Sequence, residues 1–425
     1  MEKHEKVGML LEMEKRVFID RKDELRAELE RRAQEAVDGY EARSPEVGAL
    51  KSTRFHARVL TTAYGDIRLR LRIGRTPLGS WVSPAAALLG LKPSRRFSPD
   101  VERRICTAAV ATGSYDAAHT VLDSNWLEVS VSALRRTVER LGADAREAPL
   151  ADAHRYKAGP DDTLIIMADG WHARHRGKDW GKKRSGSEEK EKCKERVHWH
   201  EIRSAIMFKL SDLACVNGER KEILRKFTTA APADTSTHDF GLMLERDARR
   251  MGLTESKAVF FVMDGGVWLW NIHQDRFSRC SKAILDFYHL SEHLHALAAE
   301  LYPGSRETAH RWCGKLLHSL KHHSPKKLFS TLQKLLDQPP SQDPVVMETI
   351  RREKAYCESH REHMDYAGCR KSGLPIGSGS VESLCSQLQN RLKRTGQFWS
   401  KEGFAALLEI IVRYRNGELN SLWAA

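Results

Sequence analysis

Two short apolar segments each end in an Asp-Gly pair, and their aspartates are the first candidates for chemistry. Thr163–Gly170 (TLIIMADG) carries Asp169, and Ala258–Gly265 (AVFFVMDG) carries Asp264. Short runs of β-forming residues closed by a turn pair are typical of buried strands, so each aspartate is expected at the mouth of a strand. A turn is the commoner role of one Asp-Gly pair, but two such pairs after two buried strands indicate a shared site.

A third carboxylate, Glu382, follows the Gly- and Ser-rich loop 373–379 in the first turn of a helix that we expect to be capped by Ser380 and to run to about Arg394. Three close carboxylates repel one another unless cations neutralise them. Oxygen ligands suit Mg²⁺ or Mn²⁺, and two such ions about 4 Å apart can promote phosphodiester displacement. The loop lacks the lysine of a phosphate-binding P-loop, so we interpret it as the hinge that brings Glu382 to the aspartates.

The elements between these residues predict how the site is assembled. After the strand that ends at Asp169, strands are expected at Val197–Leu210 and Glu222–Thr229, joined by a turn at Asn217-Gly218. A helix over about 237–251 leads to the strand of Asp264, and Ala283–His289 is a further short strand or strand end. This order predicts an α/β core with an RNase H-like mixed sheet, in which the two Asp-bearing strands lie parallel side by side. Residues from about 290 to 370 predict an all-α insertion.

The first part of the chain is predicted to bind DNA. Residues 1–42 form a long helix, which packs on its own domain or pairs with a partner chain. Residues 52–75 include a strand that alternates Ile or Leu with Arg, and these arginines face either phosphate or solvent. Residues 98–142 predict three short helices in a helix-turn-helix layout. The outward residues of its last helix are Arg135, Arg136 and Arg140.

Composition supports a polyanionic partner. The chain of 425 residues carries a formal net charge of +13, and residues 174–196 hold 10 basic against 5 acidic side chains. Further candidate DNA contacts are Lys182, Lys183 and Arg184 in this polar segment and Arg391, Lys393 and Arg394 near the C-terminus. For this last group, a solvated helix face is the simplest interpretation, and we expect Trp399 to pack rather than to stack on a base. With scattered cysteines, no signal peptide and no membrane span, a cytoplasmic location is expected.

The chain resembles the DDE transposases of bacterial insertion sequences, of the ISKra type, over roughly residues 85–422. The resemblance rests on both Asp-Gly segments, on Trp268 and Asn271, and on the segment ILDFYH (284–289) with Glu292-His293-Leu294. It is clearest in PIGSGSVES (375–383) and RLKRTGQFWS (391–400). Relatives often carry a Cys-x-x-Cys element before the helix-turn-helix region, whereas the corresponding residues 73–78 contain no cysteine. A zinc-stabilised subdomain is therefore not expected here.

The resemblance implies an RNase H-like catalytic domain with Asp169, Asp264 and Glu382 as its Mg²⁺- or Mn²⁺-binding triad. Such an enzyme would bind and cut double-stranded DNA at the terminal inverted repeats of a transposon and join the exposed 3′-hydroxyl to target DNA. Asp286 and His289 match an Asp-x-x-His motif expected to orient the site or DNA. A homodimer or higher homo-oligomer is expected, because two DNA ends must be paired.

Three other interpretations remain open. His289, Glu292 and His293 spell the H-x-x-E-H pattern of a zinc metalloprotease class. A catalytically inactive or domesticated transposase-derived protein would bind DNA without cutting it. A structure-specific nuclease of the same fold would cut branched DNA without regard to terminal repeats.

The expected organisation is a series of six segments. They are an N-terminal long helix (1–45), a small β and linker region (46–97), a helix-turn-helix domain (98–145), the first part of the core (160–290), an all-α insertion (291–372) and the C-terminal helices of the core (373–425).

Overall fold

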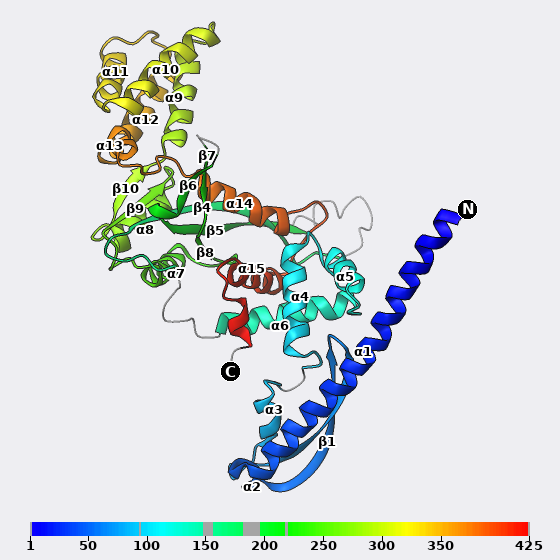
Figure 1. Ribbon diagram of the computed structural model, residues 1–425. Helices are drawn as coiled ribbons and strands as arrows, with labels where there is room; N and C mark the ends of the chain where they lie inside the picture. Colours follow the sequence, from blue (N-terminus) through cyan, green and yellow to red (C-terminus); the bar gives the residue numbers. More distant parts are fainter. Residues whose placement is uncertain (1, 93–94, 148–155, 182–195, 217–219, 424–425) are drawn as a thin grey trace. The chain divides into compact units, whose positions relative to one another are not determined.

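The computed structural model describes residues 2–92, 95–147, 156–181, 196–216 and 220–423 (Figure 1). The chain divides into two compact units, one formed by Met1–Arg146 with Gly417–Ala425 and the other by Glu147–Asn416. Among the described residues, no helix is both long and apolar enough to cross a membrane. The described cysteines are free thiols, as the sequence predicts.

The first unit begins with a helix that packs on a small antiparallel sheet. Leu29, Ala33, Val37 and Tyr40 of the helix pack on Leu60, Ile67, Leu69 and Leu71 of the sheet, so the C-terminal half of the helix packs within its own unit. The elements are α1 (Glu2–Arg43), α2 (Pro45–Gly48), β1 (Lys51–Thr62), β2 (Gly65–Arg75), β3 (Trp81–Val82) and α3 (Pro84–Leu88), with the strands in the order β1-β2-β3.

Three short helices follow, as predicted: α4 (Pro99–Ala111), α5 (Tyr115–Ser124) and α6 (Val131–Glu147). The side chain of Ser98 accepts the backbone N–H of Val101, and Ser114 caps α5 in the same way. At α6 the hydroxyl of Ser130 accepts the N–H of Ala133 at 3.3 Å and so caps this helix.

The second unit is a mixed α/β structure around a five-stranded sheet of order β10-β9-β4-β5-β8. Strand β4 (Thr163–Arg176) is parallel to β9 (Ala258–Met263), which confirms the predicted pairing of the two Asp-bearing strands. Strand β4 is antiparallel to β5 (Val197–Lys209), β5 is antiparallel to β8 (Phe227–Ala230), and β10 (Lys282–Leu285) extends β9 in parallel.

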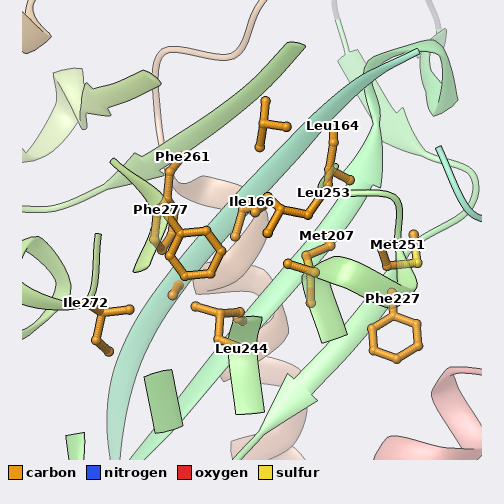
Figure 2. Packing of buried hydrophobic residues seen from close by; sticks show 14 of the residues in the cluster. Leu164, Ile166, Met207, Phe227, Leu244, Met251, Leu253, Phe261, Ile272 and Phe277 are labelled. Atoms are coloured by element: carbon orange, nitrogen blue, oxygen red, sulfur yellow. The ribbon is translucent and has the colours of Figure 1, made fainter. Parts of the chain in front are cut away.

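The two faces of this sheet are covered by different helices. On one face, Leu164, Ile166 and Phe261 pack with Leu244 of α7 (Thr237–Arg250), as Figure 2 shows. The short helix α8 (Val267–Ile272) and the π-helical turn His273–Phe277 complete this layer. Helix α14 (Gly379–Leu392) packs against β4 and β5, and α15 (Lys401–Arg415) packs against β8.

An all-α segment separates β10 from α14, as predicted, and Figure 1 shows its helices gathered together in yellow and orange. It consists of α9 (Phe287–Leu301), α10 (Arg306–His322), α11 (Lys326–Asp337), α12 (Pro344–Ser359) and α13 (Tyr366–Lys371), with a 3₁₀ turn at Arg361–His363. Further 3₁₀ turns lie at Leu210–Asp212 and Leu419–Leu422.

Four predicted boundaries are wrong. Strand β4 continues seven residues past Asp169, because β5 pairs with it as far as Arg176. The predicted strand Glu222–Thr229 is broken: β7 (Arg220–Ile223) pairs with β6 (Leu213–Val216) in a separate hairpin, and only β8 joins the main sheet. The third error is at Phe287–His289, which belong to α9 rather than to a strand. The fourth is at α14, where Ser378 and not Ser380 is the N-cap residue.

Candidate active site

Asp169 lies in the middle of β4, on the face of the sheet that α14 covers. Alternation along a strand places Leu164, Ile166 and Ala168 in the core on the α7 side and turns Asp169 to the opposite side. The pKa of Asp169 is raised to about 6, mainly by burial and in smaller part by the negative charges of Asp264 and Glu382. The N–H of Gly170, which donates to Oδ1 at 2.6 Å, acts in the opposite direction. The three carboxylates therefore interact electrostatically.

Asp264 directly follows β9, and the strand register explains its proximity to Asp169. Met167 pairs with Val262, so the same register continued by two residues sets Asp169 beside Asp264. Oδ1 of Asp264 accepts the N–H of Gly266 at 2.8 Å, and its main-chain carbonyl accepts the indole N–H of Trp270 at 2.8 Å. These two bonds fix the turn that carries the carboxylate.

Glu382 reaches the sheet from α14. Val381, Leu384 and Leu388 are buried, and Glu382 is exposed beside this apolar stripe. One turn later, the thiol of Cys385 hydrogen-bonds Asp169, and burial raises the pKa of this thiol so that it stays protonated. The contact fixes the N-terminal half of α14 against the strand that carries Asp169.

Asp286 links the all-α segment to the loop before α14. It caps α9, where Oδ1 accepts the N–H groups of Tyr288 at 2.6 Å and His289 at 3.2 Å. Its Oδ2 accepts the N–H of Ser378 at 2.7 Å and the Ser378 hydroxyl. Ser378 Oγ also lies 2.9 Å from Oε1 of Glu382, so one hydroxyl bridges the two carboxylates. Asp286 is therefore buried and holds the loop before α14 through Ser378. The sequence predicted Ser378 only as part of a hinge, whereas the structure places it in this site.

His289 lies in a chain of polar contacts on α9. Its Nε2 is 3.3 Å from Nε2 of His293, and Nδ1 of His293 is 2.7 Å from the carboxylate of Glu353 on α12. Glu292 is 82% exposed. Among the described residues no third His, Cys, Asp or Glu side chain is grouped with these two rings to complete a zinc site, which disfavours the H-x-x-E-H interpretation. Glu353 was not anticipated, because only folding brings α12 to α9.

Tyr356 is a second residue that the sequence did not point to. A Cβ on Gly265 would lie only 2.4 Å from the Tyr356 hydroxyl, so this hydroxyl lies directly against the turn of Asp264. The hydroxyl is buried and has no hydrogen-bond partner among the described residues. Burial, with Cys357 and the nearby acids, raises the pKa of Tyr356, so the hydroxyl remains a hydrogen-bond donor beside the site.

The donor set fits a hard divalent cation in its chemistry. Asp169, Asp264 and Glu382 offer carboxylate oxygens and negative charge, which Mg²⁺ and Mn²⁺ prefer. Within the described ranges, however, no three His, Cys, Asp or Glu side chains are already grouped to hold a metal ion. The side chains are near one another without forming a finished coordination shell.

The candidate DNA-binding residues differ in how exposed their side chains are and in whether they already contact other groups of the protein. Arg135 and Arg136 are exposed on α6, whereas Arg140 is bound to the buried carboxylate of Glu102 at 2.5 Å. Arg394 is exposed, and Lys393 lies 5.3 Å from the centre of the Trp199 ring.

Arg391 is buried, with its guanidinium over the ring of Trp399, so the interpretation of this group as a solvated helix face is wrong at Arg391. The indole N–H of Trp399 donates to the carbonyl of Leu392, in agreement with the predicted packing role. Lys182, Lys183 and Arg184 lie outside the described residues.

No family model matches the chain, and no curated protein matches it. Two structures are similar over most of the chain. The Drosophila P element transposase strand transfer complex shows 14% identity and a TM-score of 0.26, covering 76% of this chain and 79% of that one. The crystal structure of NurA with manganese shows 12% identity and a TM-score of 0.10, covering 69% and 65%. Likenesses this distant carry no weight for fold or activity.

Proposed function

We propose that the chain is a transposase with an RNase H-like core, which binds transposon-end DNA and catalyses metal-dependent cleavage and strand transfer. The observation that carries the proposal is the electrostatic interaction of Asp169, Asp264 and Glu382, which come from two neighbouring parallel strands and a helix 118 residues further along the chain. Burial is the main cause of the raised pKa of Asp169 and the two other carboxylates add to it, and a buried carboxylate perturbed in this way is typical of functional sites.

Asp169, Asp264 and Glu382 would hold Mg²⁺ or Mn²⁺ between them. Bound cations of this kind activate a water or a 3′-hydroxyl as nucleophile and stabilise the leaving oxygen of a phosphodiester. Glu382 is exposed and therefore has the freedom to turn toward the aspartates. Asp286 holds the loop at Ser378, and through it the first turn of α14, in the place this requires. The protonated hydroxyl of Tyr356, buried against Gly265, would help to position the turn that carries Asp264.

The substrate class follows from charge. A site of three carboxylates in a chain of net charge +13 suits a polyanion whose backbone is bound by basic side chains and whose reacting phosphate meets the cations. Double-stranded DNA is a polyanion that the exposed arginines of α6 would bind and whose phosphodiester bonds the three carboxylates and their cations would act on. Pairing of two transposon ends would require at least a homodimer.

The test is cleavage of a supercoiled plasmid that carries the coding sequence with its native flanking DNA. The full-length protein should nick or linearise it with Mg²⁺ or Mn²⁺ and lose this activity in EDTA. Asp264→Asn should reduce the rate by ~100-fold or more, because a neutral amide cannot replace a cation-binding carboxylate. Asp275→Asn, at an exposed aspartate in the turn after α8, is the matched control and should cut normally.

Each of the other outcomes would indicate a different function for this protein. If Asp264→Asn cuts like the natural chain, the site assignment is wrong. Tight DNA binding without any cutting would indicate a non-catalytic DNA-binding protein. Cutting that ignores the flanking DNA and prefers branched substrates would indicate a structure-specific nuclease.

A further inference from the structure

The two-stranded ribbon β1–β2 in the first unit has one face that nothing in that unit covers. In the antiparallel register Phe55 lies opposite Arg72, Ala57 opposite Arg70, and Val59 opposite Arg68. Directly opposed residues share a face, so these six side chains lie together. We call the set Arg68, Arg70 and Arg72 the arginine face. The other face of β2, with Ile67, Leu69 and Leu71, is buried against α1 and α3.

The arginine face is positively charged and open. Arg68 and Arg70 are exposed, and among the described residues no carboxylate lies within ion-pairing distance of either. Arg72 has Glu41 at 3.7 Å, and Asp66 is the one acidic residue on this face, at its turn end. The guanidinium groups of Arg70 and Arg72 lie 4.4 Å and 5.1 Å from the centre of the Phe55 ring, which is itself 50% exposed. The aromatic ring orders the arginines without neutralising them.

Helix α1 makes the ribbon rigid. The backbone N–H groups of Arg68, Arg70 and Arg72 donate to Glu30 at 3.1 Å, Gln34 at 2.8 Å and Glu41 at 2.7 Å. These bonds satisfy N–H groups of β2 that β1 does not use, so this edge of the sheet is closed to another strand. On β2, a partner can therefore be bound through the face and its side chains.

The spacing of the arginine face matches duplex DNA. Alternate residues of an antiparallel strand are about 6.8 Å apart, and two nucleotide steps along one DNA strand cover about the same distance. The major groove admits a two-stranded β-ribbon, arginine is the commonest partner of guanine there, and small apolar side chains contact the thymine methyl group. Ala57 and Val59 supply such side chains beside the arginines.

We propose that the β1–β2 ribbon binds the major groove of double-stranded DNA through the arginine face. This proposal rests on the proposed function in one respect: both assume that the polyanion bound by the protein is DNA. It adds a second DNA-binding surface to the helices of the first unit and makes the ribbon, rather than α6 alone, responsible for affinity.

The test is the binding of full-length protein to a fluorescein-labelled 30-base-pair duplex, followed by fluorescence anisotropy over a range of NaCl concentrations. The triple variant Arg68→Ala, Arg70→Ala, Arg72→Ala is compared with the control Arg21→Ala, Arg31→Ala, Arg32→Ala on α1. Both remove three positive charges from the formal +13, but the control arginines already pair with Glu24, Glu28 or Glu35 on their own helix. Circular dichroism and urea midpoints check that both fold.

The arginine-face variant should bind the duplex at least ~10-fold more weakly than the control, and its log–log slope against salt should fall by about 0.9 for each of the three arginines that contacts a phosphate rather than a base. Replacing the three residues by lysine should restore most of the slope. Equal affinity and slope in the variant and the control would overturn the proposal. So would an equal or larger loss on single-stranded poly(dT), or on an RNA duplex, whose major groove is too narrow to read.

Failure of this inference and failure of the proposed function are distinguishable. The arginine-face variant keeps Asp169, Asp264 and Glu382, so metal-dependent nicking at low salt tests the carboxylates separately. A natural chain that binds no duplex but still nicks the plasmid overturns the ribbon proposal alone. A chain that binds through the ribbon but never cuts overturns only the catalytic one.

Discussion

Asp169 illustrates how the environment of one residue indicates chemistry. It lies on β4, on the face that α14 covers, where burial and two neighbouring carboxylates raise its pKa to about 6. The buried thiol of Cys385 and the N–H of Gly170 partly offset this effect. A protein that needed this position only for packing would be more stable with a neutral side chain, so the carboxylate has to be explained by what it binds.

His175, further along the same strand, gives the pH prediction. It is fully buried, in contact with Phe404 and His200, and burial together with the charge of His200 lowers its pKa to about 4. Because the unfolded chain titrates near 6.5, the stabilising effect of the neutral ring is complete above that pH and is lost as pH falls toward 4. Urea unfolding should show that the natural chain loses about 2 kcal/mol more between pH 7.5 and 4.5 than His175→Leu does.

His310→Leu, at an exposed position on α10, is the control for this measurement. It should show the same pH dependence as the natural chain. If His175→Leu also follows the natural chain, protonation of this ring does not limit stability in acid.

At the scale of elements, the site depends on a junction between three of them. Strand β10 ends at Leu285, α9 begins at Phe287, and the loop before α14 is bound to both by Asp286 and by the N–H of Phe287, which donates to Ile376 at 2.9 Å. The long all-α segment therefore starts and finishes at nearly the same place. This explains how Glu382 returns to the aspartates across that insertion.

The junction can be tested with two capping aspartates. Asp286→Ala should cost about 3 kcal/mol of unfolding free energy, since it removes a helix cap and also leaves the buried N–H of Ser378 without its acceptor. Asp343 caps α12 through the N–H of Val345 at 2.8 Å but is exposed and binds no second element, so Asp343→Ala should cost about 1 kcal/mol. Urea denaturation of both variants compares them, and equal costs would show that Asp286 does not hold the loop.

Periodicity and turn residues were enough to predict the elements themselves. The long N-terminal helix, the three helices of the first unit, α7 and the parallel pair β4 and β9 follow from apolar spacing and capping residues. The β4–β9 pairing came from element order, because a helix between two strands favours a parallel return. The proximity of Asp169 and Asp264, which follows from this pairing, could therefore be predicted from the sequence.

Other features depend on tertiary contacts that local patterns do not contain. Asp169 was placed at a strand end because Asp-Gly favours turns, but the long pairing with β5 overrides that preference. The cap of α14 was assigned to Ser380, yet Ser378 is held there by Asp286, 92 residues earlier. Tyr356 and Glu353 reach the site from α12, and nothing in their local sequence distinguishes them from ordinary helical residues.

In the molecule as a whole, the exposed arginines and the acidic site belong to different units of the chain. The first unit carries exposed arginines on α6 and on the β1–β2 ribbon, and the second carries the three carboxylates. The formal net charge of +13 therefore coexists with a locally acidic site.

We propose that Asp169, Asp264 and Glu382 bind divalent cations as one set, and Mn²⁺ binding to the full-length protein measures this without any DNA. Electron paramagnetic resonance of free Mn²⁺ should show binding to the natural chain and a loss of ~10-fold or more in affinity for Glu382→Gln. Glu292→Gln, at a carboxylate 82% exposed on α9, should bind like the natural chain. Unchanged Mn²⁺ affinity in Glu382→Gln would contradict the account, because the third carboxylate would then not belong to the site.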